Sequence, residues 1–214
     1  RQASFYLMGF SHSENMTFIA PLLNALEPKA HAYVINVDGF FDEKSSPPGQ
    51  DVLGAGDAGE RYAGKQRWQP FHREICTRVP RVCTGNVAYY RERATGQWRL
   101  AGDEGLPETG IETEAPLDLA KVERAKKLGP AFIASLNTPR ECVFLTYVPH
   151  KDSEIATARA IADALGFELI APTVDGLRTF DASHLTPNSA GRYAKAFLDV
   201  AGDRIASCVD VGKA

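Results

Sequence analysis

Residues 143–170, VFLTYVPHKDSEIATARAIADALGFELI, decide the fold class of this 214-residue chain. The stretch opens on an almost unbroken apolar run, residues 143–148, which is typical of parallel strands buried on both faces. Residues 152–165 then repeat apolar side chains at helical spacing, and Gly166 is a typical helix stop. Residues 167–170 are mainly apolar again. Strand, helix and strand in this order predict a β-α-β unit with a right-handed crossover.

The N-terminal region shows the same order of elements. Residues 5–8 form a short apolar run that ends at Gly9, and apolar residues recur at helical spacing between Met16 and Leu26. Residues 32–37 are a second apolar run. We therefore expect strand, tight turn, helix and strand here, so that both ends of the chain contribute to one sheet.

The C-terminal segment predicts a last helix. Thr186 suits the N-cap and Pro187 the first helical position, and Gly202 is expected to end the helix. Its apolar face would comprise Ala190, Tyr193, Ala194, Phe197, Leu198 and Ala201. Together these elements predict an α/β fold, a three-layer α/β/α sandwich with a mainly parallel sheet and flavodoxin-like topology.

The middle of the chain, at about residues 40–125, shows neither the helical spacing nor the unbroken apolar runs of the two ends. Residues 41–64 and 96–116 are rich in Gly, Pro and polar side chains, which predicts a long irregular insert able to wall a substrate cleft. Two short runs, 87–90 and 98–100, are expected to pair as a hairpin within it. With 44% hydrophobic residues, the length suits one buried core, so we expect a single domain over the whole chain.

Composition excludes several classes of function. The formal charge of -3 gives no basic field, so nucleic acid is not an expected partner. No run approaches the roughly 18 apolar residues of a membrane span, although a start at Arg1 just before an apolar run fits part of a longer, membrane-associated protein. Neither a metal nor another cofactor is expected, because His31, His72 and His150 show no metal-ligand spacing.

Four cysteines bear on the compartment. Cys76 and Cys83 lack the spacing of a zinc site, and a disulfide between them is plausible. Cys142 and Cys208 would form a second disulfide, although Cys142 also suits a small buried apolar residue at the start of a strand. The even number favours a periplasmic or extracellular protein.

Ser11 is the candidate nucleophile. It follows the first expected strand in a Gly-x-Ser turn that begins at Gly9, and a helix comes next. The positive end of the helix dipole and its N–H groups would favour negative charge developing there. The alternative is that Ser11 or Ser13 only caps the helix.

Asp181 and His184 supply the other parts of a triad. An aspartate three residues before a histidine can bond to its Nδ1 and fix its tautomer, which leaves Nε2 for a general base. The alternative is a surface loop with a capping aspartate. Since Ser11 lies at one end of the chain and this pair at the other, the fold must bring them together.

These two motifs resemble those of the SGNH (GDSL-like) hydrolase family. Residues 9–13, GFSHS, are similar to its nucleophile block, and residues 181–187, DASHLTP, are similar to its last block. The resemblance covers roughly residues 5–40 and 140–202. It implies that Ser11 attacks an ester to form an acyl-serine, while the base and its orienting aspartate come from the last block.

The same resemblance implies an oxyanion hole of three donors. Two would be the backbone N–H groups of Ser11 and Gly39, which follows the second expected strand. Asn86 is the favoured third donor, ahead of the Gly-rich residues 54–57, although it lacks the aspartate that follows in the family. The chain also departs from the family at Phe10, where an aspartate is usual.

The Gly-x-Ser-His-Ser form is similar to SGNH domains that O-acylate or deacylate glycans. We therefore expect an ester hydrolase or O-acyltransferase acting on acetyl-like groups of a carbohydrate, or on another small ester, with hydrolysis and transfer both left open. Four aromatic residues of the insert would stack on sugar rings or pack in the core: Trp68, Tyr89, Tyr90 and Trp98.

Two other classes of function stay open. Phe10 and the missing aspartate after Asn86 favour a catalytically inactive, carbohydrate-binding domain on the same fold. A flavodoxin-like binder of nucleotide or phosphate would use the turn at Gly9 and would give His184 no role.

Overall fold

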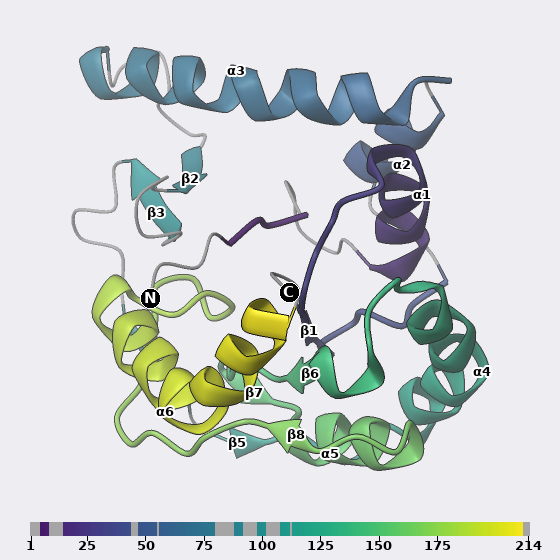
Figure 1. Cartoon of the computed structure of the whole chain (residues 1–214). Coiled ribbons are helices and arrows are strands. Elements are labelled where there is room, and N and C mark those ends of the chain that lie inside the picture. Colours follow the sequence, from purple (N-terminus) through teal and green to yellow (C-terminus); the bar gives the residue numbers. More distant parts are fainter. Residues whose placement is uncertain are drawn as a thin grey trace.

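A computed structural model describes residues 5–8, 15–43, 47–54, 56–79, 88–91, 98–101, 108–111 and 113–211. Its central sheet has the strand order β1-β6-β8, and both strand pairs are parallel (Figure 1). The strands are β1 (Tyr33–Asn36), β6 (Val143–Thr146) and β8 (Leu169–Ile170). The prediction that the N-terminal and C-terminal thirds share one parallel sheet is confirmed by the pairing of β1 with β6.

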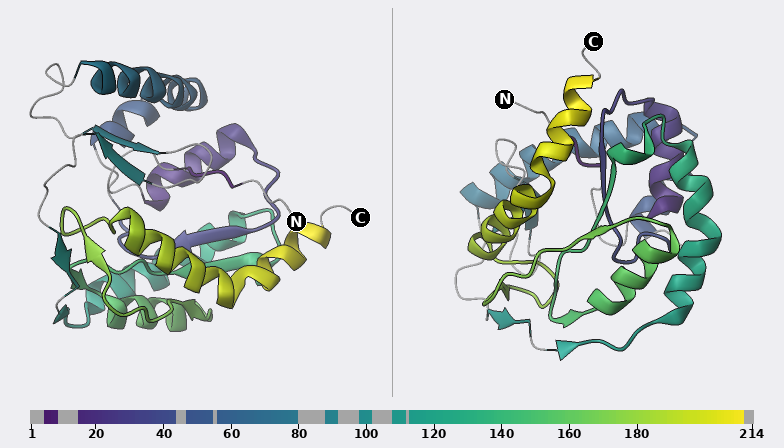
Figure 2. Two further views of the ribbon diagram at one scale, coloured as in Figure 1. Left: turned by 90° about the vertical axis from the view of Figure 1, so that its left-hand side faces the viewer. Right: turned by 60° about the horizontal axis from the view of Figure 1, so that its bottom comes forward.

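Helices cover both faces of this sheet (Figure 2). On one face, Leu145 packs with α1 (Met16–Leu26), α4 (Leu119–Ser135) and α5 (Ile155–Ala164). On the other face, Phe144 packs against α6 (Pro187–Val211). Because neighbouring residues of a strand point to opposite faces, a strand buried on both sides must be apolar throughout, as the sequence of β6 is up to Thr146.

Local side chains cap the starts of two helices, and a glycine allows two helices to pack closely. Asn15, only 2% exposed, caps α1 by accepting from the Thr17 N–H. Asp118 caps α4 in the same way, through the N–H groups of Ala120 and Lys121. Further along α4, a Cβ on Gly129 would lie 2.6 Å from Leu165 Cδ2, so the glycine allows α4 to approach the end of α5 closely.

The described part of the insert is largely helical, which corrects the prediction of an irregular segment. It contains α2 (Pro47–Leu53) and α3 (Ala58–Arg78), and α4 already begins inside the predicted range. The expected hairpin is present as β2 (Ala88–Arg91) and β3 (Trp98–Ala101). In Figure 1, α3 lies far from the sheet and contacts α1, α2 and the hairpin. Its side chains are mostly polar, so no apolar stripe marked it as a helix.

Three further predictions are corrected by the structure. Residues 5–8 form no strand, and the side chains of Phe5 and Tyr6 are exposed. α5 begins at Ile155, because Asp152–Ser153 forms the short strand β7 against β5 (Thr113–Glu114). Gly202 does not end α6, because residues beyond it are buried against the sheet.

The expected disulfide between Cys142 and Cys208 is confirmed, and it joins the start of β6 to the end of α6. Cys76 is also disulfide-bonded, while Cys83 lies outside the described residues. Within the described ranges, none of the helices has both the length and the apolar character needed to cross a membrane.

Candidate active site

Asp181 and His184 lie in a tight loop between β9 (Arg178–Thr179) and α6. Asp181 Oδ2 is 2.8 Å from His184 Nδ1, and Asp181 Oδ1 accepts hydrogen bonds from the backbone N–H groups of Ser183 and His184. Ala182 adopts the left-handed conformation, with φ of 67°. The one carboxylate therefore both closes the loop and orients the imidazole.

The histidine ring is also held by its neighbour in the loop. Phe180 stacks on it, with ring centroids 5.7 Å apart and ring planes at 8°. The Phe180 N–H donates to the His184 carbonyl, and Thr179 forms a β-bridge with Leu185, so the loop closes as a narrow hairpin. Because Nδ1 faces Asp181, proton transfer with a nucleophile would use Nε2.

Neighbouring segments fix this loop at the carboxyl edge of the sheet. After β6, the Lys151 N–H donates to the Ala182 carbonyl at 2.9 Å. On the other side, Ser189 Oγ accepts from the Arg178 N–H and is bonded to the Thr186 hydroxyl. The loop is thus tied both to the end of β6 and to the start of α6.

Gly39 lies in the turn that follows β1. Its φ of +62° favours glycine, and the Phe40 N–H closes the turn by donating to the carbonyl three residues earlier. Two contacts with α4 hold the turn: the ring of Phe40 packs edge-on against Phe132, and Asp42 forms an ion pair with Arg124 at 3.0 Å. Among the described residues, nothing accepts a hydrogen bond from the Gly39 N–H, which suits a donor to an oxyanion.

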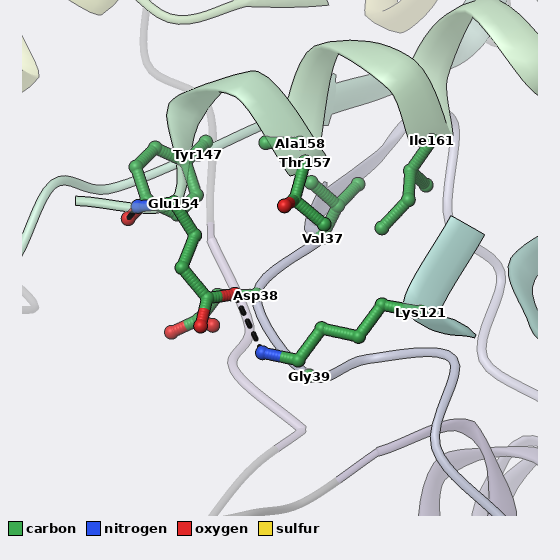
Figure 3. Close-up of a pocket in the computed structure, with 9 residues that line it drawn as sticks. All are labelled: Val37, Asp38, Gly39, Lys121, Tyr147, Glu154, Thr157, Ala158 and Ile161. Atoms are coloured by element: carbon green, nitrogen blue, oxygen red, sulfur yellow. Dashed lines mark hydrogen bonds and ion pairs between the residues drawn. The ribbon is translucent and has the colours of Figure 1, made fainter. Parts of the chain in front are cut away.

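A pocket lies beside Gly39, between this turn, α4 and α5 (Figure 3). Its apolar wall includes Val37, Ala158 and Ile161. Figure 3 shows Asp38, Lys121 and Glu154 converging at one end, with Lys121 Nζ 2.5 Å from Glu154 Oε2. Close to them, His150 Nε2 lies 3.8 Å from Asp38 Oδ2. The pocket therefore combines an apolar wall with a polar end of mixed charge.

The charges at this end perturb one another. Burial raises the pKa of the Asp38 carboxyl and Glu154 adds to the rise, whereas the charges of His150 and Lys121 oppose it. Burial alone would lower the pKa of Lys121, but its hydrogen bond to Glu154 and the nearby carboxylates raise it above its usual range. Lys121 therefore carries its charge at neutral pH.

Hydrogen bonds connect the pocket with α6. The Glu154 N–H donates to Tyr147 Oη at 2.6 Å, and the Tyr193 hydroxyl of α6 donates to the Tyr147 carbonyl. Burial raises the pKa of each of these tyrosines to about 12, so both phenols stay protonated at neutral pH. The end of β6, α5 and α6 are thereby joined in one polar network.

The structure describes three of the five residues predicted for the site. Asp181 and His184 have the contact expected of a base and its orienting group, and Gly39 lies just past the end of β1. Ser11 and Asn86 lie outside the described residues. The catalytic roles of all five stay predictions.

The sequence left two roles open for four aromatic residues of the insert, stacking on sugar rings and packing in the core. Trp68 is not a core residue, because its side chain is exposed beside Phe71 on α3. The side chains of Tyr89, Tyr90 and Trp98 lie outside the described part of the molecule. Where side chains are described, no three His, Cys, Asp or Glu residues gather as a metal site.

Sequence reasoning missed Asp38, His150 and the pair of Lys121 with Glu154. A signal for the first two was present, because Asp38 follows β1 and His150 follows β6, and these parallel strands end at the same edge of the sheet. Lys121 and Glu154 carried no such signal, since they lie near the starts of α4 and α5.

Comparison of the chain with protein-family models, with curated proteins and with solved structures found no match.

Proposed function

We propose that this protein is a serine-dependent ester hydrolase or O-acyltransferase that acts on small, acetyl-like groups of a carbohydrate. The observation that carries the proposal is the 2.8 Å contact between Asp181 Oδ2 and His184 Nδ1. An aspartate in this position holds the proton on Nδ1 and stabilises the imidazolium that forms when Nε2 accepts a proton.

The reaction would proceed in two halves. As Ser11 Oγ forms a bond to the ester carbon, its proton passes to His184 Nε2, and the carbonyl oxygen becomes an oxyanion. When the intermediate collapses, the C–O bond to the sugar breaks and His184 returns the proton to the departing hydroxyl. In the second half, water or another hydroxyl attacks the acyl-serine with the same base. Hydrolysis and transfer differ only in that acceptor.

The oxyanion would be held by the N–H groups of Ser11 and Gly39 and by the side-chain amide of Asn86. Gly39 is supported by its position after β1 and by the absence, among described residues, of a protein acceptor for its N–H. Losing one such donor typically lowers kcat about 10²- to 10³-fold.

The disulfide between Cys142 and Cys208 supports the proposal of a periplasmic or extracellular location. In such a compartment the ester would belong to a surface or exported glycan.

Release of p-nitrophenol from its acetate tests the proposal. The Ser11→Ala variant should lose at least about 10³-fold in kcat/KM, because no acyl-serine can form. Ser13→Ala is the matched control, since it removes a hydroxyl from the same block and should leave the rate within about threefold of wild type. Equal turnover by wild type and Ser11→Ala would contradict the assignment.

The second candidate function is an inactive carbohydrate-binding domain, which Phe10 favours because it replaces the aspartate that is usual before the nucleophile. In that case wild type would bind glycan but release no more p-nitrophenol than Ser11→Ala. If the protein is an enzyme that Phe10 weakens, the Phe10→Asp variant, which carries the family's usual aspartate, should be more active than wild type.

A further inference from the structure

A second Asp–His pair lies at the carboxyl edge of the sheet, formed by Asp38 and His150. The two side chains come from distant parts of the chain, which the parallel pairing of β1 and β6 brings together. Asp38 directly precedes Gly39, and His150 directly precedes Lys151, whose N–H bonds to the loop of His184. Along the chain, the pair therefore adjoins both the turn of the proposed oxyanion donor and the segment that bonds to the loop of the proposed base.

The other polar groups of the pocket have protein partners. Lys121 bonds to Glu154, the Tyr147 hydroxyl accepts from the Glu154 N–H, and Thr157 Oγ1 accepts from the N–H of Asp118. These side chains and main-chain groups form the walls of the pocket. Such bonds explain why those residues are polar, without the need for a ligand.

The Asp38 carboxylate differs. Among the described residues, its one ion-pair contact within 4 Å is His150 at 3.8 Å, which is too long for a hydrogen bond, and no N–H or O–H donates to its side chain. The charges of Lys121 and Glu154 also act on this carboxyl. The Asp38 side chain is 37% exposed and that of His150 is 20% exposed, so both can be reached from solvent. An acceptor and a possible donor thus lie across a solvent-accessible gap beside the pocket that Asp38 helps to line.

The size of this gap suits a hydroxyl group. An oxygen about 2.8 Å from each atom can lie between two atoms 3.8 Å apart, donating its proton to Asp38 Oδ2 and accepting from the Nε2–H of His150. A hydroxyl supplies both functions, whereas a carbonyl supplies only acceptors. Carboxylates of Asp38 and Glu154 disfavour an anion here, and the Lys121 ammonium disfavours a cation.

We propose that Asp38 and His150 bind a hydroxyl of the carbohydrate whose ester lies at Gly39, which makes them specificity-determining residues for a sugar. This inference rests on the proposed function and extends it from the acyl group to the polyol that carries it. The raised pKa of Asp38 agrees with it, because burial makes the carboxylate a stronger hydrogen-bond acceptor than one in water.

Kinetics on two kinds of ester test the inference. The substrates are p-nitrophenyl acetate, which has no sugar hydroxyl, and mono-O-acetylated methyl glycosides of glucose, galactose and N-acetylglucosamine. Asp38→Ala should raise KM or lower kcat/KM about 10- to 100-fold on the preferred glycoside, as expected for the loss of a hydrogen bond to a charged group. On p-nitrophenyl acetate it should change kcat/KM less than about threefold.

His150→Ala should show the same split between the two kinds of ester, and Asp38→Asn a smaller one, because an amide oxygen still accepts. Glu43→Gln is the matched control: it removes a carboxylate from the same segment, but Glu43 pairs with Lys127 outside the pocket. Equal losses on both kinds of ester would assign Asp38 to the fold or to the oxyanion turn and overturn the inference. Unchanged kinetics on every glycoside would overturn it as well.

Binding to the Ser11→Ala protein separates this inference from the proposed function. The same glycosides should shift the ring-proton NMR signals of His150 in a saturable way, and Asp38→Ala in that background should weaken binding at least about tenfold. If wild type hydrolyses no ester but this binding is seen, the proposed function fails and the hydroxyl site stands. If no glycoside shifts the His150 signals, the hydroxyl site is wrong whether or not the protein is an esterase.

Discussion

The two Asp–His pairs at the carboxyl edge of the sheet differ in how the chain makes them. Asp181 and His184 are three residues apart, and their carboxylate and ring are bonded at 2.8 Å within one loop. Asp38 and His150 come from turns after two different strands, and their side chains are 3.8 Å apart. The first pair can form wherever its loop closes, whereas the second depends on the register of β1 against β6.

This difference agrees with two separate proposed roles, a general base for the first pair and a substrate-binding site for the second. A base needs an orienting group that stays in contact throughout the reaction, and a local, bonded pair provides that contact. A substrate site needs polar groups with unfilled hydrogen-bonding capacity, which a separated pair provides.

The largest effect on activity is expected when each of the two histidines is replaced by alanine in a separate variant. His184→Ala should lower kcat/KM on p-nitrophenyl acetate about 10³-fold or more, because Ser11 loses its base. His150→Ala should change it less than about threefold. Steady-state rates of both purified variants, with circular dichroism to check folding, measure the contrast. Similar losses in the two variants would remove the distinction between the pairs.

A smaller effect, on stability alone, is expected at the opposite edge of the sheet. The double variant Cys142→Ser, Cys208→Ser should lower the free energy of unfolding by about 2–5 kcal/mol, because the bridge closes a sequence separation of 66 residues. Since the bridge joins the start of β6 to α6, both pairs should survive in the folded protein. Urea unfolding would measure the first effect, and kcat unchanged within about twofold would confirm the second.

The smallest effect is a dependence of stability on pH. Because the pKa of Asp38 is raised in the folded protein, its ionisation favours the unfolded chain, so wild type should lose stability as pH rises from about 3.9 through that raised pKa. Asp38→Asn lacks this titration. The free energy of unfolding of the variant relative to wild type should therefore increase over this range and then level off. A constant difference between pH 3 and 7 would contradict the raised pKa of Asp38.

The contrast between the pairs also explains what the sequence could predict. The spacing of Asp181 and His184 is a local property, as are the apolar run of β6 and the paired strands β2 and β3. His150 received no role from the sequence, because its relation to Asp38 exists only after two strands have paired. Local sequence patterns do not predict a site whose residues meet only when two distant strands pair.

The three errors of the sequence-based predictions have different origins. The helix α3 was missed because its mostly polar surface gives no stripe of helical period. Residues 5–8 were predicted as a strand from their apolar character, yet Phe5 and Tyr6 are exposed. Gly202 was predicted to stop α6, but the burial of Ile205 and the disulfide at Cys208 favour continuation of the helix. At Gly202, tertiary contacts outweighed a local stop signal.

The central claim is that Ser11 is a nucleophile activated by His184. Labelling with a fluorophosphonate, followed by mass spectrometry of the intact protein and its peptides, tests it most directly. The account predicts one adduct per chain, located on Ser11, that is absent in Ser11→Ala, strongly slowed in His184→Ala and unaffected in Ser13→Ala and His150→Ala. An adduct on another residue, or a labelling rate that does not depend on His184, would contradict it.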